Sequence, residues 1–77
     1  MNRRAGKTLA YAVVIEKAGR NYSAYAPDLR GVITTGATPE ATERNMRDAI
    51  ALQLRELRAA GEPIPVPTTT ATIIAAC

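Results

Sequence analysis

The stretch Gly36-Ala37-Thr38-Pro39-Glu40-Ala41 marks the point where this chain changes from strand to helix. The hydroxyl group of Thr38 can accept a hydrogen bond from the first free backbone amides of a helix, which is the role of an N-cap. Pro39 suits the first helical position because its φ angle is already fixed near the helical value, and Glu40 lies near the positive end of the helix dipole. We therefore predict that a helix begins directly after Thr38.

The predicted helix ends at Gly61, since glycine is common just after the last helical turn and Pro63 prevents the helix from resuming. It spans about 22 residues, or about 33 Å at about 1.5 Å per residue. Within it, large apolar side chains recur at the i, i+3/i+4 spacing that is typical of one buried face. This stripe comprises Met46, Ala49, Ile50, Leu54 and Leu57.

Strand-like patterns lie on both sides of the helix. Side chains alternate over residues 9–17, and further short runs rich in β-branched or aromatic residues cover residues 22–26 and 32–37. Short glycine-containing turns separate these three runs, which predicts an antiparallel arrangement. Residues 69–75, rich in threonine and isoleucine, predict a last strand. The expected fold is therefore α+β, in the order β-β-β-α-β, with a mostly antiparallel sheet and the one long helix on one of its faces.

The positive charge of the chain is concentrated at its start. The full sequence carries 10 basic and 7 acidic side chains, and Arg3, Arg4 and Lys7 have no acidic residue beside them. The basic and acidic side chains that follow are equal in number. We therefore divide the chain into a flexible basic tail over residues 1–8 and a single domain over residues 9–77. Contact of the three tail cations with nucleic acid is one open alternative, and a solvated tail is the other.

The chain has few large side chains with which to build a core. Fifteen of its apolar residues are alanines, and it contains no tryptophan or phenylalanine. A chain of this length buries only about 60% of the surface that its unfolded form exposes. Cys77 is the one cysteine, so no disulfide within a chain can add stability. We therefore expect self-association into a dimer or a larger homo-oligomer.

The composition argues against enzymatic chemistry. Histidine is absent, which removes the commonest general base and the commonest metal ligand, and no Ser–His or Cys–His pair can form within one chain. Four of the seven carboxylates lie in the predicted helix among arginines and do not suggest a metal site. We expect no catalytic residues, no metal and no cofactor, and we interpret Cys77 as an inert chain end.

The sequence also lacks the features of a membrane protein or an exported protein. No apolar run approaches the roughly 20 residues that a membrane-spanning helix needs. The stretch after the basic start has no cleavage-site pattern of small residues. We therefore expect a cytoplasmic protein that does not contact a membrane.

Four short pieces of the sequence are informative together, namely Tyr11-Ala12-Val13-Val14-Ile15-Glu16, Pro27-Asp28-Leu29-Arg30-Gly31, Gly36-Ala37-Thr38-Pro39-Glu40-Ala41 and Gly61-Glu62-Pro63-Ile64-Pro65-Val66-Pro67. In order and spacing they resemble the N-terminal domain of the HicB-family antitoxins, which also occurs as short stand-alone HicB-like proteins. The resemblance covers about residues 9–75. One departure is Arg30, which stands where the family usually has a second proline in the turn.

This resemblance implies a partial ribonuclease-H-like fold that lacks the catalytic acids of that enzyme. It also implies an inhibitory function in a type II toxin–antitoxin system, because a HicB-type antitoxin binds a small RNA-cleaving toxin of the HicA type and covers its active histidine. The expected partners are therefore such a toxin and further copies of this chain. Two alternatives remain open: a nucleic-acid-binding module that uses the basic tail, and a degenerate ribonuclease-H-like nuclease in which Asp28 would contribute to a metal site.

Two groups of residues are candidate functional positions. In the turn motif Pro27, Asp28, Leu29 and Gly31, we expect the Asp28 carboxylate to bond the backbone two residues further on and so to fix the turn. The second candidate is the sheet face opposite the helix, because one helix covers only one face. We predict that this face forms a partner interface, to which we add a leucine that lies off the helical stripe. The predicted interface residues are Ala10, Ala12, Val14 and Leu52.

Overall fold

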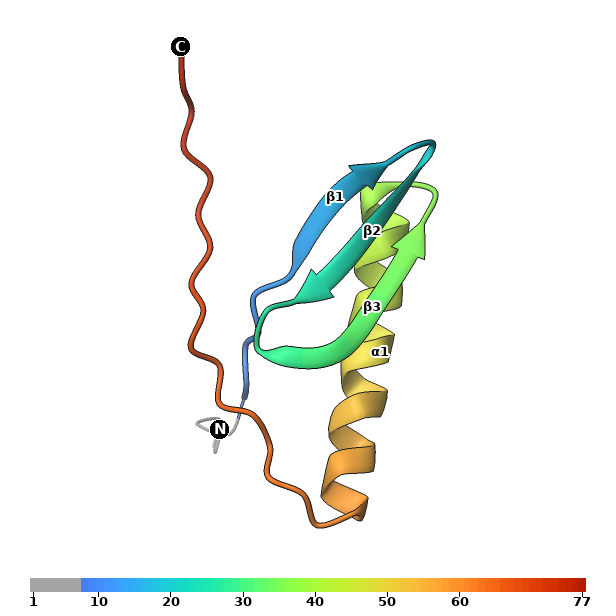
Figure 1. Ribbon diagram of the computed structural model, residues 1–77, viewed down its shortest axis with the longest axis vertical. Helices are drawn as coiled ribbons and strands as arrows, with labels where there is room; N and C mark the ends of the chain where they lie inside the picture. The colour runs from blue at the N-terminus through green and yellow to red at the C-terminus, as the bar shows by residue number, and fades with distance from the viewer. Residues whose placement is uncertain (1–7) are drawn as a thin grey trace.

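Three antiparallel strands, β1 (Val14–Ala18), β2 (Asn21–Ala26) and β3 (Leu29–Gly36), precede one long helix, α1 (Pro39–Ala59). The structure is a computed structural model that describes residues 8–77 (Figure 1). The strands lie in the order β1-β2-β3, and α1 lies against one face of the sheet (Figure 1). The expected α+β class and the β-β-β-α order are confirmed.

Two tight turns connect the strands. Gly19 and Arg20 form a two-residue turn between β1 and β2, as the glycine-containing loop predicts. Pro27 and Asp28 form the turn between β2 and β3, where the missing N–H of proline ends the ladder of β2. The register of β2 against β3 shifts beside this turn. The predicted turn motif therefore occupies this turn and the first residues of β3.

The helix begins where the sequence predicts. Thr38 is the N-cap, and its hydroxyl oxygen accepts a hydrogen bond of 3.0 Å from the backbone amide of Ala41. The hydroxyl group of Thr42, a fully buried residue, donates to the backbone carbonyl of Thr38 at 2.7 Å. A β-carbon on Gly36 would lie 2.5 Å from the Thr42 hydroxyl oxygen and 2.7 Å from its backbone nitrogen. Only glycine therefore fits where the end of β3 meets the start of α1.

Gly61 follows the end of the helix with a φ of 72°, a conformation that favours glycine. Its backbone amide donates to the carbonyl of Arg58 at 3.1 Å, and the amide of Glu62 donates to the carbonyl of Leu57 at 2.9 Å. These two hydrogen bonds satisfy carbonyl groups of the last helical turn, as in a Schellman motif. The predicted helix end is confirmed, and residues 62–77 contain no further helix or strand.

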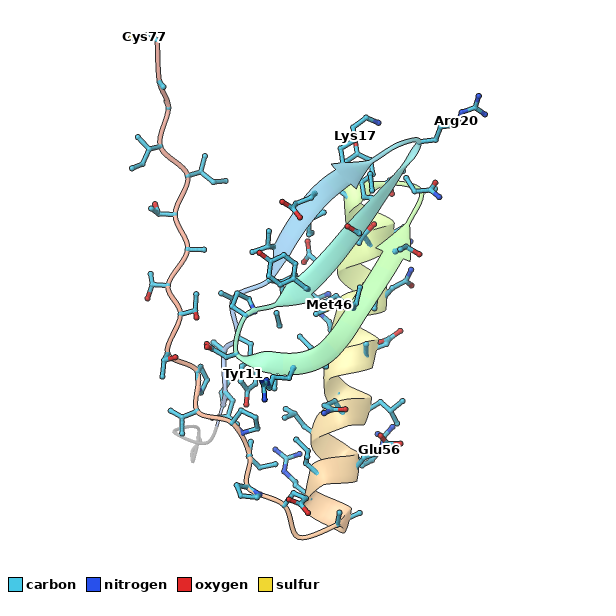
Figure 2. The ribbon with its side chains drawn as sticks, in the orientation of Figure 1. Tyr11, Lys17, Arg20, Met46, Glu56 and Cys77 are labelled. Atoms are coloured by element: carbon cyan, nitrogen blue, oxygen red, sulfur yellow. The ribbon has the colours of Figure 1, made fainter. Side chains whose placement is uncertain are left out.

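The core lies between α1 and the sheet and is small. Met46 supplies its helical side and is 1% exposed (Figure 2). The hydroxyl group of Thr34 on β3 contacts the Met46 sulfur at 3.7 Å. Two of the five buried apolar residues are alanines, so the core contains little side-chain volume. The five are Ala24, Ala26, Leu29, Val32 and Met46, and their partly buried neighbours are Tyr11, Val13, Ile15, Ala49, Ile50 and Leu54.

The first strand is shorter than the sequence predicts. A strand is expected over residues 9–17, but β1 begins only at Val14. Val14 pairs with Tyr25, and β2 ends one residue later, so the residues before Val14 lack a neighbouring strand with which to exchange hydrogen bonds. Ala10 and Ala12 therefore precede the strand, and Ala10 is exposed.

The last expected strand does not form. Residues 69–75 pair with no described strand, because they lie apart from β1 across an open cleft. Ile73 is 98% and Ile74 82% exposed. Figure 1 shows this segment as an extended run that leaves the body of the molecule. The radius of gyration, 14.2 Å, accordingly exceeds the value of about 11.5 Å for a compact chain of this length.

Met46→Ala should destabilise the fold because truncation of a buried methionine leaves a cavity and costs about 2–5 kcal/mol. Each 1 kcal/mol shifts the Tm of a domain of this size by about 4–8 °C, so thermal denaturation should show a Tm lower by about 10 °C or more. Leu52→Ala is the matched control, since Leu52 lies on the same helix but is 47% exposed. Both variants are measured at the same protein concentration. An equal decrease in Tm for Met46→Ala and Leu52→Ala would contradict the core described above.

Candidate functional site

The sheet face that α1 leaves uncovered carries a row of apolar side chains. Val14 pairs with Tyr25 and Tyr25 pairs with Ile33, so the three side chains lie beside one another across the whole sheet. We call these three residues the apolar row. The neighbouring residues Ala24 and Val32 point the other way, into the core. Tyr25 is 42% and Ile33 70% exposed, so much of this row is open to a partner.

A polar row borders the apolar row on the same face. Glu16 pairs with Ser23, and Ser23 pairs with Thr35. The side chains of Glu16 and Thr35 are exposed. An apolar centre next to a polar margin is the usual composition of a protein–protein interface.

The structure separates the four predicted interface residues. Val14 belongs to the apolar row, whereas Ala10 and Ala12 precede β1. Leu52 projects from α1 and lines a shallow groove of about 170 Å³ beside Ile33, at the outer edge of β3. Leu52 and Val14 therefore lie at opposite sides of the sheet, and the four residues do not form one continuous surface.

Two members of the apolar row are absent from the sequence prediction. Tyr25 lies between Ala24 and Ala26, and the period of two along β2 contains the signal that its side chain faces away from the two alanines. Ile33 has the apolar Val32 beside it, so alternation in β3 does not show which of the two is buried. The register with β2 is needed to place Ile33 in the row.

Asp28, in the turn between β2 and β3, binds residues 68 and 69, where the last segment of the chain begins. Its carboxylate accepts hydrogen bonds from the backbone amides of Thr68 and Thr69, each at 2.9 Å. The hydroxyl groups of the same two threonines also donate to it, at 3.1 and 2.9 Å. This corrects the local role predicted for Asp28, since these partners lie 40 and 41 residues further along the chain. Two successive amides and two hydroxyls give the carboxylate four donors, which match its acceptor sites.

These hydrogen bonds lower the pKa of the Asp28 carboxyl group below its ordinary value. The backbone amide of Thr68 is the largest cause and the amide of Thr69 the next, and both hydroxyl groups act in the same direction. All four donors stabilise the charged form, because N–H and O–H groups bond a negatively charged carboxylate more strongly than a neutral carboxyl group, whose own O–H adds a fifth donor. The charged form of Asp28 is therefore the form that holds the end of the chain.

A second long-range contact holds the same part of the chain. The hydroxyl group of Tyr11 donates to the backbone carbonyl of Pro65 at 2.6 Å. Figure 2 shows Tyr11 where the segment leading into β1 approaches the connector that follows α1. With the contact of Asp28, this bond fixes the connector at two points, so the path of the chain into residues 69–75 is set by the body of the domain.

Open apolar surface remains on both sides of β1. One cleft of about 620 Å³ lies between residues 13–15 and residues 71–73. Another cleft, of about 350 Å³, lies between the start of β1 and α1 and is lined by Val13, Ile15 and Ile50 among others. The helix packs chiefly on β3 and β2, which explains why the side of β1 is less well covered.

The described residues contain no group of three or more histidine, cysteine, aspartate or glutamate side chains placed to hold a metal. The thiol of Cys77 is free and exposed. Glu43 and Arg47 form an exposed ion pair of 2.8 Å along α1, a helical contact worth about 0.2–0.5 kcal/mol.

Within residues 8–77, no helix is both long and apolar enough to cross a membrane. The predicted tail cations belong to residues 1–7 and lie outside the described residues.

Comparison of the chain with protein-family models, with curated proteins and with solved structures gives no match. The function is therefore inferred from the residues and their geometry. The apolar row and the clefts beside β1 are the surfaces on which a partner could bind.

Acid should release the end of the chain from the Asp28 turn. Because the pKa of Asp28 is lower in the folded chain, its contribution to stability is fully present above the ordinary value of 3.8 and is lost as the pH falls through the lowered value. In an NMR titration, the amide shifts of Thr68 and Thr69 should change with a midpoint below pH 3.8. Asp28→Asn should remove this transition. A midpoint at or above 3.8, or an unchanged titration in the variant, would contradict the contact.

Proposed function

We propose that this chain is a non-enzymatic, cytoplasmic antitoxin of the HicB type, which binds a small RNA-cleaving toxin of the HicA type and neutralises it. One observation carries the proposal. Each of the four sequence pieces that resemble the N-terminal domain of HicB-family antitoxins makes a long-range contact or sets the boundary of a helix or strand in this fold. The function that follows from them is the binding of a protein, without chemistry on the part of this chain.

The four pieces contact one another or fix the boundary of an element. Tyr11 of the first piece donates to Pro65 of the fourth. Asp28 of the second piece accepts hydrogen bonds from the two threonines that directly follow the fourth. Thr38 of the third piece caps α1. A turn or cap motif alone occurs in many folds. The contact between the first and fourth pieces, and the contact of the second piece with the residues directly after the fourth, show that these pieces meet in the folded chain, which supports the resemblance.

We place the toxin on the apolar row. Val14, Tyr25 and Ile33 lie side by side across the sheet, with Tyr25 and Ile33 exposed, and tyrosine is among the residues that contribute most to protein interfaces. Basic and acidic side chains are equal in number over residues 8–77. Affinity would therefore come from apolar burial and shape, and it should depend weakly on salt. Contact of the basic tail with phosphates, the alternative function, should weaken steeply as salt is added.

The position of Asp28 favours the antitoxin over the degenerate nuclease. Both oxygens of its carboxylate accept hydrogen bonds from Thr68 and Thr69. They are therefore engaged with the chain itself and are not free to bind a metal ion in this arrangement. RNA cleavage that requires Mg²⁺ and disappears in Asp28→Asn would reverse this choice.

The test begins with the reading frames that flank the gene of this chain. The proposal predicts that one of them encodes a small basic protein with one candidate catalytic histidine, and this protein is then co-expressed with the chain. We expect the two proteins to co-purify and the complex to lose RNA-cleaving activity. Tyr25→Asp and Ile33→Asp each place a charge in the apolar row and should weaken binding by about tenfold or more. Ala51→Asp, at an exposed position of α1, is the control and should bind like the unaltered chain.

Two results would contradict the proposal in different ways. If the neighbouring protein neither binds nor loses activity, the antitoxin function is wrong. If it binds equally well to the row variants and to the control, the antitoxin function stands but the toxin does not dock on the apolar row.

A further inference from the structure

The last segment of the chain has the composition of a strand but pairs with no strand among the described residues. Residues 69–75 carry no charge and consist of threonine, isoleucine and alanine, of which the first two favour strands. Ile73 and Ile74 are almost fully exposed. Uncharged segments of this length and β-propensity, with no proline, pair readily with other strands. Such a segment is expected to be covered in the native protein.

The edge of β1 is the matching surface. One edge of β1 pairs with β2, and the other pairs with no described strand. Apolar side chains lie on both faces of β1, because Val14 belongs to the apolar row while Ile15 packs toward the core. A strand that pairs here therefore needs apolar residues on both of its faces. Ile73 and Ile74 meet this need, since consecutive residues of a strand point to opposite faces.

We propose that two copies of this chain exchange their last segments, so that residues 69–75 of one copy pair with β1 of the other. Around a two-fold axis the two segments also pair with each other. The result is one continuous sheet in the order β3-β2-β1-segment-segment-β1-β2-β3, in which the segment beside each β1 comes from the other copy. This inference goes beyond the proposed function and does not require a toxin.

The proposed arrangement requires space for one strand between β1 and the chain's own last segment, and the cleft beside β1 lies at this position. It separates residues 13–15 from residues 71–73 of the same chain and has a volume of about 620 Å³. Figure 1 shows that β1 and the last segment run in the same general direction. With the two-fold axis perpendicular to the strands, the segment of the second copy runs in the opposite direction. Placed in the cleft, it would be antiparallel both to β1 and to the segment on the far side.

The chain's own segment is a poorer occupant of the cleft than a second copy. Asp28 holds Thr68 and Thr69, and Tyr11 holds Pro65, so the start of the segment is fixed on the far side of the cleft. The own segment would also add to β1 as a parallel strand. Antiparallel pairing is slightly more stable per residue, and it is the pairing that a second copy offers.

The neighbouring surfaces complete the fit. The smaller cleft, of about 350 Å³, opens on the helix side of β1 and is lined by Val13, Ile15 and Ile50. One isoleucine of the inserted segment would enter this side, and the other would extend the apolar row beside Val14. Each copy gives and receives the same segment, as a two-fold interface between identical chains requires.

The test is the mass of the full chain in solution, measured by light scattering after size-exclusion chromatography. We expect a dimer, with twice the 8.2 kDa of one chain. The double variant Ile73→Asp/Ile74→Asp should be a monomer, because the charges oppose pairing on both faces of the segment. It should keep its helical circular dichroism, since neither isoleucine belongs to the core. Leu52→Asp, a charge on another exposed apolar residue, is the control and should remain dimeric.

A monomeric mass for the unaltered chain would overturn the inference, and so would a dimer that persists in the double variant. Dissociation of the Leu52→Asp control would place the contact elsewhere and would overturn it as well. Toxin binding by the same variants distinguishes the two proposals. A dimer that ignores the toxin contradicts only the proposed function, whereas a monomer that binds it contradicts only the strand exchange.

Discussion

A single helix covers one face of a three-stranded sheet, and the rest of the molecule depends on this constraint. In the described residues the core has five buried apolar side chains, of which two are alanines. Burial of one large apolar side chain stabilises a protein by about 1.5–3 kcal/mol, so this core leaves a narrow margin. Apolar side chains remain open on the uncovered sheet face, beside the outer edge of β1 and on the last segment. We propose that contact with other chains covers these surfaces and stabilises the fold.

The contact between Asp28 and the two threonines links the small core to these open surfaces. It holds the end of the chain by charge-assisted hydrogen bonds at a turn, where burial alone would be insufficient. The bond between Tyr11 and Pro65 supports the same connector. A segment that starts from a fixed point loses less conformational freedom when it pairs with another strand than a free chain end does. The two contacts therefore prepare residues 69–75 for pairing.

Features encoded by neighbouring residues could be predicted from the sequence, and features that need a distant partner could not. The helix boundaries follow from Thr38 and Gly61, whose capping roles are local. The start of β1 depends on where β2 ends, which the alternation over residues 9–17 does not contain. The strand predicted over residues 69–75 does not form for the same reason: a strand needs a neighbouring strand, and among the described residues this segment has none. In the candidate site, the partners of Asp28 lie 40 and 41 residues away, so no local motif could predict them. The exposed position of Ile33 could not be predicted either, because it follows from the pairing of β3 with β2.

The central physical claim is that the apolar edge of β1, which no strand of the same chain covers among the described residues, binds the last segment of a second copy. The most direct measurement is isotope-filtered NMR on a sample mixed from labelled and unlabelled chains, because it detects contacts between copies alone. We predict contacts between residues 70–75 of one copy and residues 13–16 of the other. A spectrum without such contacts, in which residues 70–75 move independently of the body, would contradict the claim.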